Sequence, residues 1–260
     1  MIDLLSPSEV QAARPAGAFV ANTLHALKAK TTVGTNLLEI NEWATDMIAA
    51  AGATSCYVDY APSFGSGPFG KVICISVNDA VLHGLPYSYR VRNGDLVTLD
   101  FAVKLNGWVA DSAISFVVGE PKSDTDQHMI DTTERALAAG IAAAVPGNRI
   151  GDISHAVGTV LSEAGYAINT DFGGHGVGRT MHQDPSVPND GRPGRGTPLR
   201  PGLLLAIEPW IMLDTDELVT DKDGWTLKSA TGSNTAHSEH TIAITAGAPL
   251  ILTAFEPAKA

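Results

Sequence analysis

The feature that most constrains this chain of 260 residues is an internal repeat. Residues 34–52 and 147–165 each begin at one glycine and end at another, and the apolar residues between them fall at matching positions. Their spacing follows the period of a helix with one apolar face, and the closing glycines are typical of helix C-caps. We therefore expect a helix in each segment. A weaker helical pattern precedes each one, at residues 7–30 and 123–145.

A second pair of similar segments follows in the same order. Residues 92–100 and 200–208 each contain a turn, an apolar run and a final carboxylate, Asp100 in one and Glu208 in the other. A turn that leads into such a run indicates a strand. Chance could supply one match, but two in the same order favour duplication. The sequence thus predicts two similar α+β halves, each with two helices followed by strands, and a site between them that receives a carboxylate from each.

The composition fits one enzyme-sized domain over residues 1–260. The hydrophobic share of 44% suffices for a sizeable core. The net charge of −11 repels nucleic acid and anionic membranes, so we expect neither as a partner. No segment has the pattern of a signal peptide or a membrane span, and we expect a cytoplasmic protein. Cys56 and Cys74 lack the spacing of a thiolate metal site and are expected to be reduced.

Two carboxylates converge on a predicted hairpin. Asn106-Gly107 joins apolar strands at residues 96–105 and 108–118 and is a strong signal for a two-residue turn. That register places Asp111 opposite Ala102. Because side chains alternate between faces, Asp100 shares the face of Asp111 and is its diagonal neighbour. An exposed acidic pair is the alternative from this hairpin alone, and the apolar neighbours of Asp100 argue against it.

His175 lies in a glycine-rich segment, residues 173–178, where the backbone can approach another group closely. The segment lacks the lysine of a phosphate-binding loop, which argues against a nucleotide there. His182 follows seven positions later, and Glu239 stands at the entry of an apolar strand. The Gly/Pro-rich residues 185–202 predict one long surface loop beside these groups.

Carboxylates with one imidazole suit divalent metals such as Mn, Fe(II), Co or Zn. Four acids can supply the bridging ligands that two metals about 3.5–4 Å apart require. The sequence has neither the nucleophile motif G-x-S-x-G nor the zinc-binding motif H-E-x-x-H. The donor set therefore predicts a two-metal hydrolase.

The ordered set of these donors resembles that of the methionine aminopeptidases, which share the pita-bread fold with prolidases and creatinases. The similarity runs from about residue 72 to residue 245 and includes residues 78–86, 207–209 and 222–226. It implies an α+β pita-bread fold with two pseudo-symmetric halves of helices packed on an antiparallel sheet, in agreement with the repeats. Glu239 follows Glu208 by only 31 positions, so the helical insertion of type II enzymes does not fit and type I is the better match. We expect no further N-terminal domain of the prolidase kind.

The resemblance also implies the metal ligands. Asp111 and Glu239 would bridge two divalent ions. Asp100 would bind one of these ions, and His175 and Glu208 would bind the other.

Three residues take catalytic roles in this resemblance. Glu208 would carry the proton, His182 would stabilise the oxyanion, and His83 would bond the scissile peptide nitrogen or its neighbour. A histidine that only packs a turn is the alternative for His83.

The family's pocket for the first side chain is apolar, and Phe69, Cys74 and Trp225 match its positions. Three further pocket positions depart from the usual pattern. Met181 replaces an aromatic residue, Trp210 replaces methionine, and His237 replaces glutamine. Residues 56–70 are also longer than expected of the family.

The resemblance implies a monomeric enzyme that removes N-terminal methionine from nascent polypeptides or peptides and prefers a small second residue. The resemblance neither requires nor excludes the ribosome as a partner. Two alternatives remain: an aminopeptidase of the same fold with another first-residue preference, and a binding module of this fold that has lost catalysis.

Overall fold

The structure, a computed structural model, describes residues 2–63 and 65–256. Its helices are α1 (Pro7–Lys30), α2 (Leu37–Ala51), α3 (Asp124–Ala143) and α4 (Ile150–Glu163). All four predicted helices are therefore confirmed, with ends that agree to within a few residues. The described residues contain no helix with the length and apolar character needed to cross a membrane.

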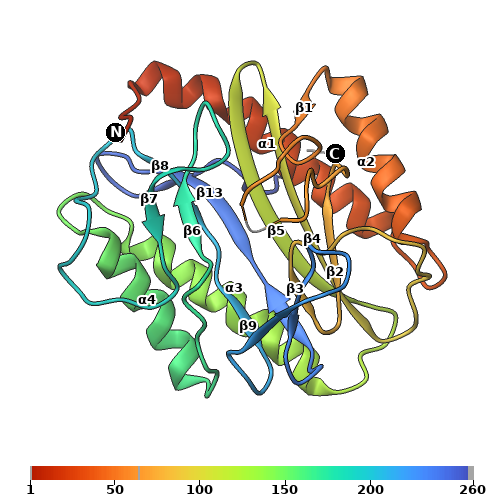
Figure 1. Cartoon of the computed structure of the whole chain (residues 1–260). Coiled ribbons are helices and arrows are strands. Elements are labelled where there is room, and N and C mark those ends of the chain that lie inside the picture. Colours follow the sequence, from red (N-terminus) through yellow and green to blue (C-terminus); the bar gives the residue numbers. More distant parts are fainter. Residues whose placement is uncertain (1, 64, 257–260) are drawn as a thin grey trace.

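The main sheet has the strand order β1-β4-β5-β13-β8-β6-β7, with β2 paired to β4 and β14 paired to β13 (Figure 1). All of these pairings are antiparallel. The strands are β1 (Thr54–Ser55), β2 (Cys74–Val77), β4 (Asp95–Leu105), β5 (Trp108–Val118), β6 (Gly174–Gly176), β7 (Gln183–Val187), β8 (Leu204–Ile207), β13 (Glu239–Ala243) and β14 (Leu250–Ile251).

Two smaller sheets complete the fold. One has the order β10-β11-β3 and the other pairs β12 with β9. Their strands are β3 (Ala80–Leu82), β9 (Trp210–Met212), β10 (Leu218–Thr220), β11 (Leu227–Ser229) and β12 (Thr235–His237).

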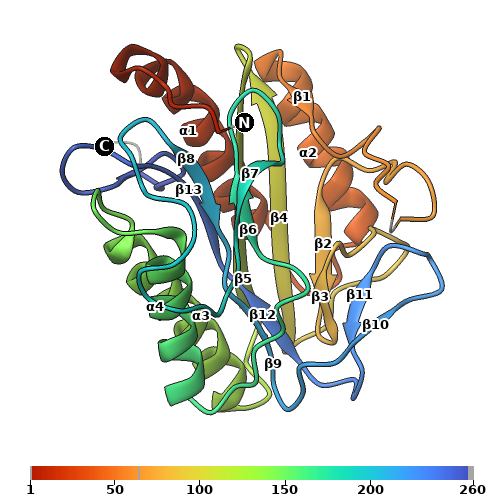
Figure 2. The ribbon, with the colours of Figure 1, turned by 60° about the vertical axis from the view of Figure 1, so that its left-hand side comes forward.

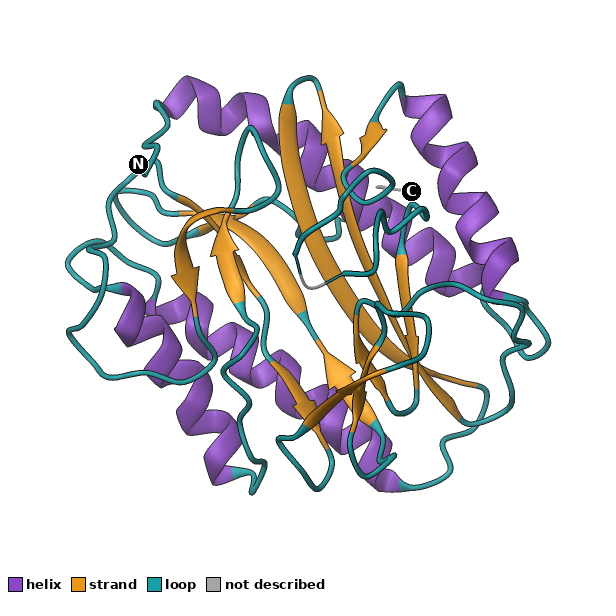
Figure 3. Cartoon of the chain, in the orientation of Figure 1, coloured by secondary structure: helices purple, strands orange, loops and turns teal. Residues whose placement is uncertain are grey.

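The helices line the main sheet in two pairs, one for each half of the chain (Figures 1 and 3). Figure 2 shows α3 and α4 beside β8 and β13, while α2 lies near β1 and β2. Each pair has its own buried apolar cluster. Leu24 and Ile40 belong to the first cluster, and Met129 and Ile153 belong to the second. The sequence repeats predict two similar halves, and the two apolar clusters agree with this prediction.

The repeated helices also begin in the same way. The Glu39 side chain accepts a hydrogen bond from the Asn36 amide at 2.7 Å, and the Asp152 side chain accepts one from the Arg149 amide at 2.7 Å. A carboxylate at this position satisfies an amide that the helix itself leaves unpaired. The matching acids in the two sequence repeats thus have the same structural role.

The predicted hairpin forms with the expected register. Asn106 and Gly107 both have positive φ, 52° and 82°, as a two-residue type I′ turn requires. Asp111 pairs with Ala102, so the diagonal relation of Asp111 to Asp100 is confirmed.

Two details of the strand predictions are corrected. Asp100 lies within β4 and does not end it, because the strand continues to the turn at Asn106; Glu208, by contrast, directly follows β8. The predicted long loop starts only after Val187, because residues 185–187 belong to β7 and pair with β6.

Candidate metal centre

Five strands that are neighbours in the sheet carry the five predicted ligands toward one place. Asp100 is in β4, Asp111 in β5, Glu239 opens β13, Glu208 follows β8, and His175 is the central residue of β6. The strand order β4-β5-β13-β8-β6 therefore brings together residues that are up to 139 positions apart in the chain.

The pairing register aligns these side chains. Glu239 pairs with Ala113, which also pairs with Asp100 across β5. On the other side, His175 pairs with Ala206, two residues before Glu208. Ligand atoms of Asp111, His175 and Glu239 all lie within 4.8 Å of one another. This spacing suits three donors around one cation.

His175 has the tautomer that a metal ligand needs. Its Nδ1 lies 2.9 Å from the Gly176 carbonyl oxygen, which can only accept a hydrogen bond, so Nδ1 carries the proton. Nε2 is then left with its lone pair and lies 3.5 Å from Glu208 Oε1. Burial lowers the pKa of His175 to about 3, which keeps the ring neutral. Both features favour coordination through Nε2.

The four carboxyl groups repel one another when ionised; those of Asp111 and Glu239 belong to buried residues, and those of Asp100 and Glu208 to half-buried ones. Burial raises the pKa of Asp100 to about 6, and burial with the charge of Asp100 raises that of Glu208 to about 8. The pKa values of Asp111 and Glu239 are raised well above the usual range, by burial first and by neighbouring carboxylates second.

These groups fit divalent cations. Glu239 Oε1 is buried with no hydrogen-bond partner within the described residues, and a buried carboxylate oxygen without a partner is costly. Cations between the carboxylates would supply the missing partner and offset the mutual repulsion. Hard oxygen donors with one imidazole are the set that Mn, Fe(II), Co and Zn accept.

A cavity opens onto the cluster, and both auxiliary histidines line it. The ring of His182 stands edge-on to that of His175, with centroids 4.3 Å apart. Burial lowers the pKa of His83 to about 4 and also lowers that of His182. Both imidazoles are therefore neutral near pH 7, and each can donate one N–H.

The apolar wall of the cavity includes four of the predicted pocket residues, Phe69, Cys74, Met181 and Trp225. The Phe69 and Trp225 rings meet edge to face at 5.2 Å. Cys74 is buried and pairs with Asp100 across β2 and β4.

The two other predicted pocket residues lie behind this wall and are not among those that line the cavity. His237 is buried, with Nε2 3.8 Å from Glu208 Oε2. Trp210 packs in an apolar cluster with Val81, Leu82 and Met212. Both lie next to residues that line the cavity, because Glu208 and Leu82 belong to its wall.

Three residues that line the cavity were not predicted: Tyr57, Tyr60 and Leu82. The tyrosines come from residues 56–70, whose unusual length left this wall of the pocket unassigned. The Tyr60 ring contacts the His182 ring, with centroids 5.2 Å apart and an angle of 53° between the ring planes. The segment has no helical or strand periodicity, so the sequence does not indicate which of its aromatic side chains face the cavity.

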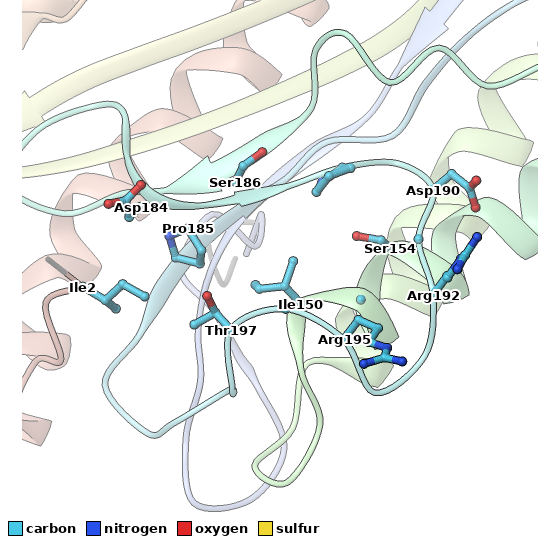
Figure 4. Close-up of a pocket in the computed structure, with 14 residues that line it drawn as sticks. Ile2, Ile150, Ser154, Asp184, Pro185, Ser186, Asp190, Arg192, Arg195 and Thr197 are labelled. Atoms are coloured by element: carbon cyan, nitrogen blue, oxygen red, sulfur yellow. The ribbon is translucent and has the colours of Figure 1, made fainter.

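A second, larger cavity lies at the start of α4 and shares no lining residue with the first (Figure 4). It has a volume of about 540 Å³, and its lining includes Arg192, Arg195 and Ser154. The group of ligand-type side chains found among the described residues lies at the first cavity. Donor chemistry, and not size, therefore identifies the candidate site.

Residues 11–246 match the sequence model of metallopeptidase family M24. Among curated proteins, the chain is 44% identical to methionine aminopeptidase 1 of Mycobacterium tuberculosis, over 95% of this chain and 93% of that protein. It is 41% identical to methionine aminopeptidase of Clostridium perfringens, over 97% of this chain and 99% of that protein.

Comparison with solved structures also shows similarity to methionine aminopeptidases. The methionine aminopeptidase of Thermotoga maritima superimposes with a TM-score of 0.92 at 34% identity and covers 98% of this chain and 100% of that one. The prolidase of Pyrococcus horikoshii OT3 has the same fold, with a TM-score of 0.75 at 21% identity, and there this chain spans 64% of the other.

Proposed function

The chain belongs to metallopeptidase family M24, and we propose that it removes N-terminal methionine from nascent proteins and peptides, with two divalent metal ions at the candidate metal centre. The expected pita-bread fold is shared with the family's solved members. Divalent metal use follows from the family, while the number of ions and their identity are part of the proposal.

One observation carries this proposal. Five side chains of ligand type line one cavity: four come from strands β4, β5, β13 and β6 of the main sheet, and Glu208 directly follows their neighbour β8. Asp111 and Glu239 are nearly inaccessible, at 4% and 3% exposed. Carboxyl groups so close together and so little exposed stay ionised near pH 7 only with counter-charges beside them, and two divalent cations would supply those charges.

Two divalent cations held there would lower the pKa of a water molecule and polarise the peptide carbonyl. In our proposal, Asp111 and Glu239 would be shared by the two ions, Asp100 would bind one ion, and His175 and Glu208 would bind the other. Glu208 would also accept the proton that the attacking water releases.

The two neutral histidines have roles toward the substrate. His182 donates to the developing oxyanion, and its place beside the His175 ring supports this role. His83 bonds the scissile peptide nitrogen or its neighbour. His83 has a positive φ of 54°, which is uncommon for a residue other than glycine, and its ring meets that of Phe172 edge to face, with centroids 5.5 Å apart.

The first side chain of the substrate would enter between Phe69, Trp225 and Met181. These residues form an apolar wall that suits an unbranched thioether. His237 and Trp210, which lie directly behind the wall, would set its shape. We further propose that the protein acts in the cytoplasm as a monomer, on chains that leave the ribosome.

The first experiment tests the metal requirement. Chelation is expected to abolish peptide cleavage, and Mn(II), Co(II) or Fe(II) to restore it. Activity is measured after metal removal verified by elemental analysis. Full activity of verified metal-free protein would contradict the proposal.

The second experiment tests the substrate. Met-Ala-Ser should be cleaved with a kcat/KM at least about tenfold above that of Leu-Ala-Ser, a gap of roughly 1.4 kcal/mol, because leucine branches where the wall fits a straight chain. Equal rates, or a preference for a basic or proline first residue, would instead identify an aminopeptidase of other specificity. Metal binding without cleavage of any peptide would identify a binding module.

A further inference from the structure

The phenol of Tyr57 reaches into the carboxylate cluster. Its hydroxyl lies 2.5 Å from Asp100 Oδ1 and 3.2 Å from Asp111 Oδ1. The side chain is buried, with the residue 6% exposed. Tyr57 thus contacts two of the five candidate ligands.

The hydrogen bonds have a defined direction. The phenol is the donor to both oxygens, and it has to be once Asp100 and Asp111 are ionised as metal ligands, because ionised carboxylates only accept. It carries one proton, and the shorter contact identifies Asp100 as the main acceptor, with Asp111 as the secondary one. The oxygen therefore lies between a carboxylate of β4 and a carboxylate of β5.

The backbone around Tyr57 is held to the strand that carries Asp100. Ser55 of β1 pairs with Val103 of β4, and the Cys56 amide donates to the Ala102 carbonyl at 3.1 Å. The Tyr57 amide donates to the Ser55 hydroxyl at 3.1 Å.

The ring is held as well. It contacts the Phe69 ring edge to face, with centroids 5.8 Å apart. Backbone and ring together leave the phenol little freedom, so it can act as a fixed reference point for the two carboxylates.

We propose that Tyr57 is a positioning residue, whose hydrogen bonds hold Asp100 and Asp111 in the orientation in which they bind metal. This inference rests on the proposed function. An aspartate carboxyl rotates over a broad range about its last bond, and four neighbouring carboxylates tend to turn away from one another. A fixed donor between two of them selects one arrangement before the cations arrive.

Loss of such an outer partner of a metal ligand lowers metal affinity by about 10–100-fold in other sites. We expect an effect in this range from Tyr57→Phe, which removes the hydroxyl and keeps the ring. The matched control is Tyr60→Phe. Tyr60 lines the same cavity, but its hydroxyl makes no hydrogen bond within the described residues.

The experiment measures Mn(II) binding to chelator-treated protein by calorimetry, without substrate. Tyr57→Phe should bind Mn(II) about 10–100-fold more weakly than wild type, and Tyr60→Phe should keep the wild-type affinity whatever its effect on peptides. The visible absorption spectrum of the Co(II) form should change in Tyr57→Phe alone, because ligand orientation sets that spectrum. At saturating Mn(II), the kcat of Tyr57→Phe should recover toward the wild-type value.

Unchanged metal affinity in Tyr57→Phe, with only a raised KM for peptides, would show that Tyr57 is merely part of the pocket wall. Tighter binding would show that the phenol competes with the metal, and would also overturn the inference. Failure of wild-type protein to bind Mn(II) would instead contradict the proposed function.

If Tyr57→Phe does not fold, Ser55→Ala provides the test, because it frees the Tyr57 amide and keeps the phenol. A smaller loss of affinity is expected there, and no loss would reject the inference.

Discussion

At the scale of single residues, the site combines groups that repel one another with rings that carry no charge. His237 is buried and His83 and His175 are half-buried; loss of hydration lowers the pKa values of His83, His175 and His237 to about 4, about 3 and about 3. Neutral imidazoles can bind a cation or donate one hydrogen bond without adding positive charge beside it. Position separates their roles: His175 Nε2 lies 3.5 Å from Glu208 Oε1, whereas His83 and His182 line the cavity that would receive a substrate.

That separation gives a first prediction. His182→Ala and His83→Ala should each lower kcat/KM by about 10²–10³, as loss of one transition-state donor does. Metal content should stay at the wild-type level, because neither ring is a ligand. Peptide kinetics and elemental analysis of the same preparations measure both quantities. Loss of metal from His182→Ala would make that residue a ligand and contradict the assignment.

At the scale of elements, the neighbouring strand β8 fixes β6 so tightly that only glycine fits at its start. A Cβ on Gly174 would lie 2.2 Å from the Ala206 carbonyl oxygen, which belongs to the backbone of β8 and cannot turn aside. Close strand packing therefore explains Gly174, and also Gly176, whose Cβ would lie 2.2 Å from the Asp184 carbonyl oxygen. The same packing holds His175 opposite the residues that precede Glu208.

Gly174→Ala should accordingly push β6 away from β8 and displace the His175 ring. We expect metal affinity to fall at least about tenfold, with a comparable loss of activity at limiting metal, since outer support of a ligand has effects of this size. Gly178→Ala is the control. Its Cβ would meet only the end of the Gln183 side chain, at 3.3 Å, and that side chain can move. Equal metal affinity of Gly174→Ala and wild type, measured by calorimetry, would show that β6 adjusts without moving the ligand.

At the scale of the whole molecule, stability should depend on pH differently with and without metal. The pKa of Glu208 is raised to about 8, and the pKa values of Asp111 and Glu239 are also raised well above their usual range, by burial first and by neighbouring carboxylates second. The metal-free folded state thus holds protons that the unfolded chain has already released. For such groups, stability is fully present below the unfolded pKa and is lost as pH rises through the folded pKa.

We therefore expect the melting temperature of metal-free protein to fall by roughly 2–6 °C from pH 7.5 to pH 8.5, since each such group contributes up to about 1.4 kcal/mol per pH unit. The histidines of the site do not interfere in this range, because burial lowers their pKa values in the folded state and keeps them neutral above pH 7.5. The metal-loaded protein is the control and should show no such fall, because its carboxylates carry no protons. Scanning calorimetry measures both forms. A flat metal-free profile would mean that these carboxyl groups are ionised without a cation.

Much of this molecule could be predicted from the sequence alone, because the signals are local or repeated. In residues 37–51 and 150–163 the apolar residues recur with the spacing of a helix, and a glycine follows each segment closely; these two signals determine two helices. Asn106-Gly107 determines a turn and hence the register that brings Asp100 beside Asp111. The type and order of the five donor residues, with their resemblance to a known family, indicated metal chemistry before any coordinates.

Only the tertiary structure decided which side chains face the site from segments that have no period. Tyr57 and Tyr60 lie in an irregular stretch, where the direction of a ring depends on packing against Phe69, His182 and β4. Likewise, the sequence placed Trp210 and His237 near the pocket, but their positions behind its wall follow from the pairing of β9 with β12. The type of each residue determines which chemistry its side chain can perform. Its contacts depend on long-range packing, which no short stretch of sequence encodes.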